Sequence, residues 1–283
     1  MSVVTFILFS TIGFEYLSVD PVAHRVGMGY GMMNDGYSVH YNPAGLAFST
    51  TTSYSASYLN YMGGTNLGFL GYERSQLGIA IRYFNSGAMK KTDEWGNEQG
   101  NFGAHFIDLN LGKGFIYKTV GLGFSAKIVY ENIDTLSSLG AGVDIGALYT
   151  LTQPGVQIGL ALKNLGFGIK SFINEKETFP YEINLGFIKQ FEPGWVGLDL
   201  VKPALTGFGL RLGGAYTVTS FVTLKASYNT LLSSIQTGGG GLDFLAGLTA
   251  GICVKAGKFS IDYSYSPYFD FGGGHRVSIS MGG

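Results

Sequence analysis

The chain has 283 residues and a net charge of −1, and 45 of its residues are Gly, 21 are Phe and 18 are Tyr. Only 13% of the residues are charged, against roughly 25% in typical soluble domains. This composition excludes a disordered chain, the single Cys253 excludes a disulfide scaffold, and the balanced charge provides no field that would recruit nucleic acid. Low charge with many Gly and aromatic residues favours strands that alternate between two different solvents.

The N-terminal residues 1–14 include an apolar run, Val3–Phe14, of the length of an export signal. No Lys or Arg precedes Arg25, so the basic start typical of such signals is absent. The run therefore indicates either a weak export signal or an N-terminal strand or plug element. No later stretch has the ~20 consecutive apolar residues that a membrane-spanning helix needs.

Residues 15–48 show no alternation and are rich in Gly and Met. Because this non-strand segment precedes a series of strands, we expect it to form a plug inside or beneath a barrel. Within it, Pro43 fixes its own φ and keeps Asn42 out of the helical region. Asp35, Asn42, Pro43 and Ala44 are the candidate plug and gating residues. The Asn42 turn is either a hinge without ligand contact or part of a gate.

From about residue 51 onward, apolar residues recur with a period of two, as in half-buried strands. Fourteen windows alternate in this way: 51–61, 65–73, 76–84, 104–113, 119–131, 140–150, 155–165, 180–192, 195–203, 207–217, 221–230, 244–255, 258–266 and 275–282. Many have the roughly 9–11 residues that a tilted membrane-crossing strand needs. The pattern predicts an all-β fold, a transmembrane antiparallel up-and-down barrel of about 14 strands with an N-terminal lumenal plug. A soluble sandwich or barrel would carry more charge.

The connections between these windows alternate in length. Tight turns are expected at Gln153–Gly155 and Glu192–Gly194, and longer loops at 85–103, 134–139, 166–179 and 231–243. Short turns at one end and long loops at the other are typical of outer-membrane barrels.

The charged residues of the strands fall on the face opposite the apolar one, which we expect to line the lumen. The candidate lumen charges are Arg82, Asp108, Lys127, Glu131, Asp144, Lys163, Glu182, Asp199, Arg211, Lys225, Lys255, Asp262 and Arg276. Their near balance predicts ion pairs across the lumen that brace the barrel and hold the plug, and it disfavours an ion-selective pore.

Catalytic and metal motifs are absent from the sequence. The four His residues have no ligand partner at metal-binding spacing, and there is no G-x-S-x-G elbow. We therefore expect no enzyme activity, no metal and no cofactor.

An ordered set of motifs runs along most of the chain. It comprises Gly27-Met28-Gly29, Asp35 and Asn42-Pro43-Ala44-Gly45-Leu46-Ala47, then Thr92-Asp93-Glu94-Trp95-Gly96, Leu162-Lys163-Asn164-Leu165-Gly166, Asp199-Leu200-Val201-Lys202-Pro203, Leu248-Thr249-Ala250-Gly251, Asp262 to Tyr268, and His275-Arg276. In this set the sequence resembles the PorV/PorQ family of FadL-like outer-membrane proteins. It departs from that pattern at Ser280–Gly283, which lack a terminal aromatic residue, and in its shorter length. No acyl-chain-binding residue can be matched.

The resemblance implies an outer-membrane barrel (49–283) with an N-terminal hatch (15–48) after the apolar segment (1–14). It also implies one of two functions. FadL-like relatives pass hydrophobic small molecules across the outer membrane, which we take as the expected function. PorV- and PorQ-like relatives are closed barrels that serve type IX secretion or surface attachment, which is the alternative. The expected partners are outer-membrane lipid and either a hydrophobic ligand or a secretion-system protein.

Overall fold

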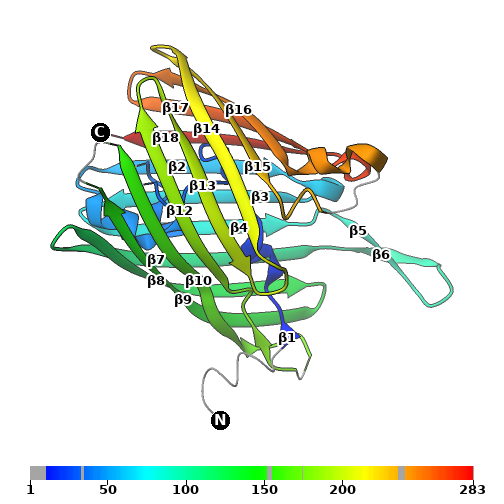
Figure 1. Cartoon of the computed structure of the whole chain (residues 1–283). Coiled ribbons are helices and arrows are strands. Elements are labelled where there is room, and N and C mark those ends of the chain that lie inside the picture. Colours follow the sequence, from blue (N-terminus) through cyan, green and yellow to red (C-terminus); the bar gives the residue numbers. More distant parts are fainter. Residues whose placement is uncertain (1–10, 33–34, 152–154, 174, 235–239, 283) are drawn as a thin grey trace.

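The long strands form a closed barrel in which neighbouring wall strands are antiparallel (Figure 1). The computed structural model describes residues 11–32, 35–151, 155–173, 175–234 and 240–282. The main sheet has sixteen strands, of which β1 and β11 are two-residue strands, so fourteen form the wall of the described chain. The wall closes where β18 pairs with β2. The predicted fourteen-stranded fold is therefore confirmed.

The wall strands follow one another around the barrel in chain order. They are β2 (Ser53–Asn60), β3 (Asn66–Arg74), β4 (Leu77–Asn85), β7 (Ala104–Tyr117), β8 (Val120–Ile133), β9 (Leu136–Thr150), β10 (Val156–Lys170), β12 (Glu182–Phe191), β13 (Gly194–Pro203), β14 (Gly209–Thr219), β15 (Val222–Asn229), β16 (Leu248–Ala256), β17 (Phe259–Pro267) and β18 (Gly273–Gly282).

The two ends of the barrel differ, and we call them the short-turn rim and the long-loop rim. The short-turn rim holds tight connections such as Ser75–Gln76. The long-loop rim carries η3 (Met62–Gly64), the hairpin of β5 (Met89–Thr92) and β6 (Glu98–Phe102), β11 (Glu177–Thr178), η4 (Gly240–Gly247) and η5 (Phe269–Phe271). In Figure 1 the β5–β6 hairpin and the C-terminus lie at opposite ends. The loop expected over 134–139 is wrong, because β9 begins at Leu136 and pairs there with Ile133.

The outer face of the wall is apolar, which inverts the arrangement of a soluble barrel. Leu70 and Ile128 are 60% and 58% exposed, whereas Glu73, Ser125 and Lys127 of the same strands are buried on the inner face. Exposed aromatic residues lie towards both ends, among them Tyr58, Tyr83, Tyr130, Tyr263 and Tyr265 near the long-loop rim and Tyr54, Phe115, Tyr117, Tyr149, Tyr216 and Phe259 near the short-turn rim. An apolar band between two aromatic girdles fits a bilayer core and its two interfaces. None of the helices in the described residues is long and apolar enough to cross a membrane.

The N-terminal segment lies inside the barrel, seen in blue behind the front strands of Figure 1. It contains β1 (Thr11–Ile12), η1 (Glu15–Ser18), α2 (Ser38–Tyr41) and η2 (Pro43–Phe48), and leads into β2 at Ser53. It begins near the long-loop rim, where β1 pairs with β11, and reaches the short-turn rim at η2. The export signal considered for Val3–Phe14 lies mostly outside the described residues, and Phe14 is buried against Phe179.

Candidate functional site

The barrel interior changes character along its axis. On β4, β7 and β8 the sequence runs from aromatic or aliphatic residues at the long-loop rim, through a charged residue, to Gly near the short-turn rim. On β4, for example, Phe84, Arg82, Ala80 and Gly78 follow one another on the inner face. From the long-loop rim to the short-turn rim, the interior therefore contains three zones. They are an aromatic cluster that includes Phe84 and Phe106, a charged belt that includes Arg82, Asp108 and Lys127, and a glycine surface that includes Gly78, Gly112 and Gly123.

The belt contains ion pairs between side chains of the wall. They are Arg82 Nε–Asp108 Oδ2 (2.9 Å), Lys127 Nζ–Asp144 Oδ1 (2.9 Å), Lys225 Nζ–Asp262 Oδ1 (2.6 Å) and Arg211 Nη2–Glu182 Oε1 (3.6 Å). Each joins neighbouring or next-neighbouring strands, whereas the sequence predicted pairs across the lumen. The prediction is wrong on this point because the N-terminal segment occupies the space between opposite walls.

The same belt holds the backbone of the N-terminal segment. Its side chains donate to successive carbonyls: Arg82 to Leu17 (3.2 Å), Arg276 to Asp20 (2.9 Å), Lys225 to His24 (2.7 Å) and Ser227 to Val26 (2.5 Å). The N–H of Gly29 donates to Asp199 Oδ2 at 2.9 Å. Apart from the two-residue strand β1, which pairs with β11, the segment is thus attached to the wall mainly through side chains, and the wall ladder closes without it.

Asp35 and Arg25 form an ion pair within the N-terminal segment. Nε and Nη2 of Arg25 each lie 2.6 Å from a carboxylate oxygen of Asp35, and the guanidinium stacks over the Tyr41 ring at 4.4 Å. Burial alone would raise the pKa of Asp35, but the adjacent Arg25 holds that pKa below its usual value. This pair stays charged and fixes the fold of the segment.

Asn42 joins the segment to the wall. Its Nδ2 donates to the carbonyls of Tyr30 (2.8 Å), Ala147 (3.3 Å) and Leu160 (3.3 Å), and its Oδ1 accepts from Ala44 N–H at 3.0 Å as the N-cap of η2. Pro43 takes the first position of that helix, where its missing N–H costs nothing. The turn read from the sequence is therefore a contact between N-terminal segment, β9 and β10.

Inward-facing glycines let the segment approach the wall this closely. A Cβ on Gly123 would lie 2.2 Å from the carbonyl carbon of Pro43, and one on Gly114 would lie 2.1 Å from the N of Ala47. Any side chain at these positions would push η2 off the wall. The glycines are therefore part of the site.

Most of the lumen charges predicted from the sequence lie on the inner face of the barrel, as the alternation of the strands predicts. Eleven of the thirteen are buried on the inner face: Arg82, Asp108, Lys127, Glu131, Asp144, Lys163, Glu182, Asp199, Lys225, Asp262 and Arg276. The Arg211 side chain is 15% exposed. Lys255 is exposed, because it lies beyond Cys253 towards the end of β16, where the strand leaves the packed interior.

Sequence reasoning missed several partners in the interior. Glu73 is fully buried and accepts from Ser38 N–H at 2.6 Å, but it sits beside a tight turn and looks like a turn residue. It shares its face with Leu67 and Phe69, and this alternation could have placed it inside. Asp20, His24 and Arg25 belong to the segment without periodicity, so no pattern could assign their partners.

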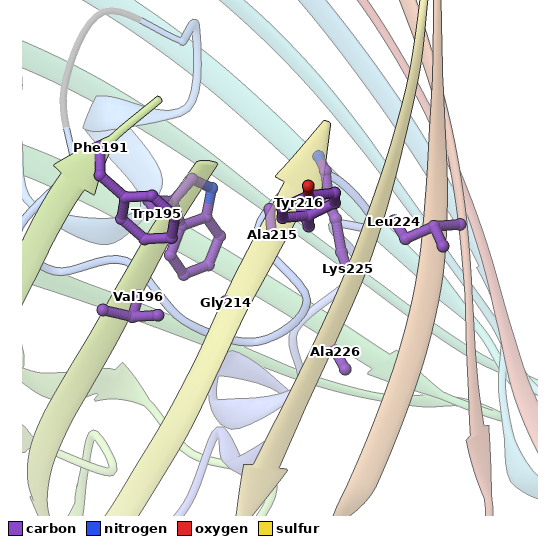
Figure 2. A pocket seen from close by; sticks show the side chains of 9 residues that line it. All are labelled: Phe191, Trp195, Val196, Gly214, Ala215, Tyr216, Leu224, Lys225 and Ala226. Carbon is purple, nitrogen blue, oxygen red and sulfur yellow. The ribbon is translucent and has the colours of Figure 1, made fainter. Parts of the chain in front are cut away.

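A shallow groove of about 460 Å³ lies on β12–β15 in the half near the short-turn rim (Figure 2). It is lined by Phe191, Trp195, Val196, Gly214, Ala215, Tyr216, Leu224, Lys225 and Ala226. Val196, Tyr216 and Leu224 are exposed on the outer, lipid-facing side. The groove therefore belongs to the surface that meets lipid chains and not to the interior.

A closed antiparallel barrel with an apolar outer band and a polar, filled interior is an outer-membrane β-barrel. No family model matches the chain. The UPF0164 protein of Treponema pallidum (strain Nichols) is 25% identical over an alignment of 238 residues that covers 72% of this chain and 51% of that protein. The chain thus spans about half the length of this curated relative.

Among solved structures, the chain is similar to FadL-like barrels. The crystal structure of the Pseudomonas putida toluene transporter TodX aligns with a TM-score of 0.54 and 13% identity, over 89% of this chain and 95% of that one. A Pseudomonas aeruginosa FadL homologue gives 0.52 and 13%, over 89% and 94%. A TodX monoaromatic hydrocarbon channel deltaS2 mutant gives 0.58 and 12%, over 94% and 98%. These likenesses show a FadL-like fold and do not single out PorV or PorQ.

Proposed function

We propose that this barrel passes hydrophobic small molecules across the outer membrane and that the N-terminal segment, residues 15–48, controls the passage. The observation that carries the proposal is the attachment of this segment. It fills the lumen, yet it is tied to the wall by side-chain hydrogen bonds and packing, while the fourteen-stranded ladder is complete without it. Movement of the segment can therefore open a route while the wall stays closed. The similar TodX structure is that of a toluene transporter, which supports this substrate class.

A disulfide that ties the segment to the wall tests the proposal. The N–H of Ala23 donates to Ser278 Oγ of β18 at 2.8 Å, so cysteines at these two positions are close enough to bond. The background is Cys253→Ala, which removes the only native thiol. We expect Ala23→Cys/Ser278→Cys to lose uptake of toluene into proteoliposomes when oxidised and to recover it when reduced.

The matched control ties the wall to itself. Ser57 and Ser278 are cross-strand partners whose hydroxyls lie 2.7 Å apart, so Ser57→Cys/Ser278→Cys forms a disulfide that leaves the N-terminal segment free. We expect this variant to take up toluene equally in both redox states. Equal uptake by the oxidised Ala23–Ser278 variant would show that the segment does not control the passage.

The finer resemblance to PorV and PorQ would make the barrel a closed partner-docking component of a type IX-like secretion or surface-attachment system. No contact among the described residues favours that role, and the comparisons lend it no support. We therefore propose transport as the function.

A further inference from the structure

Among the described wall strands, one buried carboxyl group accepts no hydrogen bond from the protein. Seven carboxylates on the described wall strands are buried: Glu73, Asp108, Glu131, Asp144, Glu182, Asp199 and Asp262. Six of them accept a hydrogen bond from a cation, a hydroxyl or a backbone N–H. Glu131, which is 4% exposed, receives none from any described residue. A buried carboxyl without a protein donor takes up a proton or is completed by water or by a ligand that donates to it, so Glu131 is open to a ligand.

Glu131 borders the aromatic cluster near the long-loop rim. Its strand partner on β7 is Phe106, and the preceding inward residue on β8, Val129, is fully buried in the cluster. A second acid, Glu177, has a buried Oε2 that also lacks a hydrogen-bond partner. This end of the interior thus offers two acceptors without donors.

Aromatic rings surround this end of the interior. Phe84 and Phe106 stack with centroids 5.0 Å apart, Tyr16 lies 5.2 Å from Phe106, and Phe14 lies 4.7 Å from Phe179. Aromatic faces attract cations, most strongly where water is excluded. The nearest cation of the belt on β4, Arg82, is already paired with Asp108. Acid and rings together form an incomplete site for a positive group.

We propose that Glu131 and the aromatic cluster bind the ammonium group of a hydrophobic amine, so that the barrel selects aromatic amines over neutral and anionic molecules of the same size. This inference rests on the proposed transport function and specifies its substrate class. Tyr16 belongs to the N-terminal segment and Phe14 immediately precedes it, so room for the ligand beside Glu131 arises when that segment moves.

Four probes of one size class test the inference: benzylamine, benzyl alcohol, toluene and benzoate. Uptake into proteoliposomes is measured against protein-free liposomes for the wild type, Glu131→Gln and the control Glu98→Gln. Glu98 is an exposed acid of the β5–β6 hairpin, paired with Lys90. We expect the wild type to favour benzylamine over benzoate by about tenfold or more, since a buried charge pair contributes on the order of a tenfold change in affinity or more.

The variants separate this inference from the proposed function. We expect Glu131→Gln to lose most of the preference for benzylamine while toluene uptake stays unchanged, and Glu98→Gln to behave as the wild type. If toluene enters but benzylamine has no advantage, or if Glu131→Gln keeps the advantage, the amine site is wrong and the transport function stands. If no probe enters above the protein-free background, the proposed function itself fails, and the inference fails with it.

Discussion

Gly146 of β9 and Asn42 of the N-terminal segment touch with no room for a side chain between them. A Cβ on Gly146 would lie 1.9 Å from Oδ1 of Asn42, well inside van der Waals contact. The side chain of Asn42 therefore packs directly on the backbone of the wall at Gly146, where it also donates to the carbonyls of Ala147 and Leu160. The position of the segment depends on the absence of one methyl group.

Gly146→Ala should loosen the N-terminal segment without unfolding the wall. The added methyl must displace Asn42, and overpacking of this kind costs about 1–3 kcal/mol. Trypsin reports the result cleanly, because Arg25 is the only Lys or Arg before Arg74 and is fully buried in the packed segment. We expect faster cleavage after Arg25. Gly68→Ala is the control, since its Cβ would meet nothing closer than 3.9 Å; equal cleavage rates in the two variants would contradict the close fit.

Asn42→Asp and Asn42→Ala should separate the two parts of this contact. Asp keeps the acceptor that caps η2 through Ala44 N–H but loses the donor to the carbonyls of Tyr30, Ala147 and Leu160. Ala loses both, and each buried group left without a partner costs about 1–3 kcal/mol. We expect cleavage after Arg25 to rise in both variants, and toluene uptake to rise with it if the turn is part of the gate. Raised cleavage with unchanged uptake would identify Asn42 as a hinge only.

The wall could be predicted from the sequence because each strand repeats a two-residue pattern over most of its length. Where the pattern weakens, the boundaries fail. Ser137 and Ser138 looked like a loop, but Ser138 is an inward residue of β9 that is fully buried and donates to Lys170 O at 2.8 Å. Small polar residues such as Ser are common both in turns and on the inner face of a barrel, so composition alone cannot distinguish a turn from an inward-facing strand.

The partners of the N-terminal segment could not be predicted in the same way. Asp20 and His24 contact Arg276 and Asp262, which are more than two hundred positions away, and Arg25 pairs with Asp35 within the segment. Nothing periodic relates these partners. Asn42-Pro43 was recognisable only because its turn chemistry is local. Glycines on the inner face leave space next to the wall, but which residues fill that space depends on the tertiary fold.

Breaking the Lys127–Asp144 pair should destabilise the barrel far more than breaking a surface pair. Both side chains are almost fully buried and lie 2.9 Å apart. Lys127→Met leaves a buried carboxylate, which costs about 3–5 kcal/mol, whereas the double variant Lys127→Met/Asp144→Leu removes both charges and should cost less than the two single changes together. The unfolding midpoint in detergent measures each cost.

Lys90→Met serves as the matched control for this comparison. Its partner Glu98 lies on the exposed β5–β6 hairpin, and such pairs contribute less than about 1 kcal/mol. A shift for Lys127→Met no larger than that for Lys90→Met would show that the belt does not brace the wall.

His40 should make the packing of the N-terminal segment weaken below pH 6.5. Burial, assisted by the cation of Lys163, lowers the pKa of His40 from 6.5 to about 3, although Asp20 at 3.8 Å opposes this shift. Between about pH 3 and pH 6.5, His40 therefore stays neutral while the N-terminal segment is packed in the barrel, and it binds a proton when the segment is released. Because the released state takes up more protons there, each pH unit below 6.5 costs the packed state up to about 1.4 kcal/mol, and the effect disappears above pH 6.5.

Asp20 does not contribute between pH 5 and 8, since His40 and Arg276, acting against burial, hold its pKa below the usual value.

The measurement is the unfolding midpoint in detergent between pH 8 and pH 5 for the wild type and His40→Phe. Phenylalanine fills the same space against Tyr41, whose ring centroid lies 4.8 Å from that of His40, but it cannot titrate. Groups that do not contact His40 titrate alike in both proteins, so the difference between the two curves reports His40 together with its partner Asp20. We expect the wild type to lose about 2 kcal/mol more than the variant on going from pH 6.5 to pH 5. Parallel curves would mean that His40 is not held neutral by its surroundings and that the packing around α2 is looser than this structure shows.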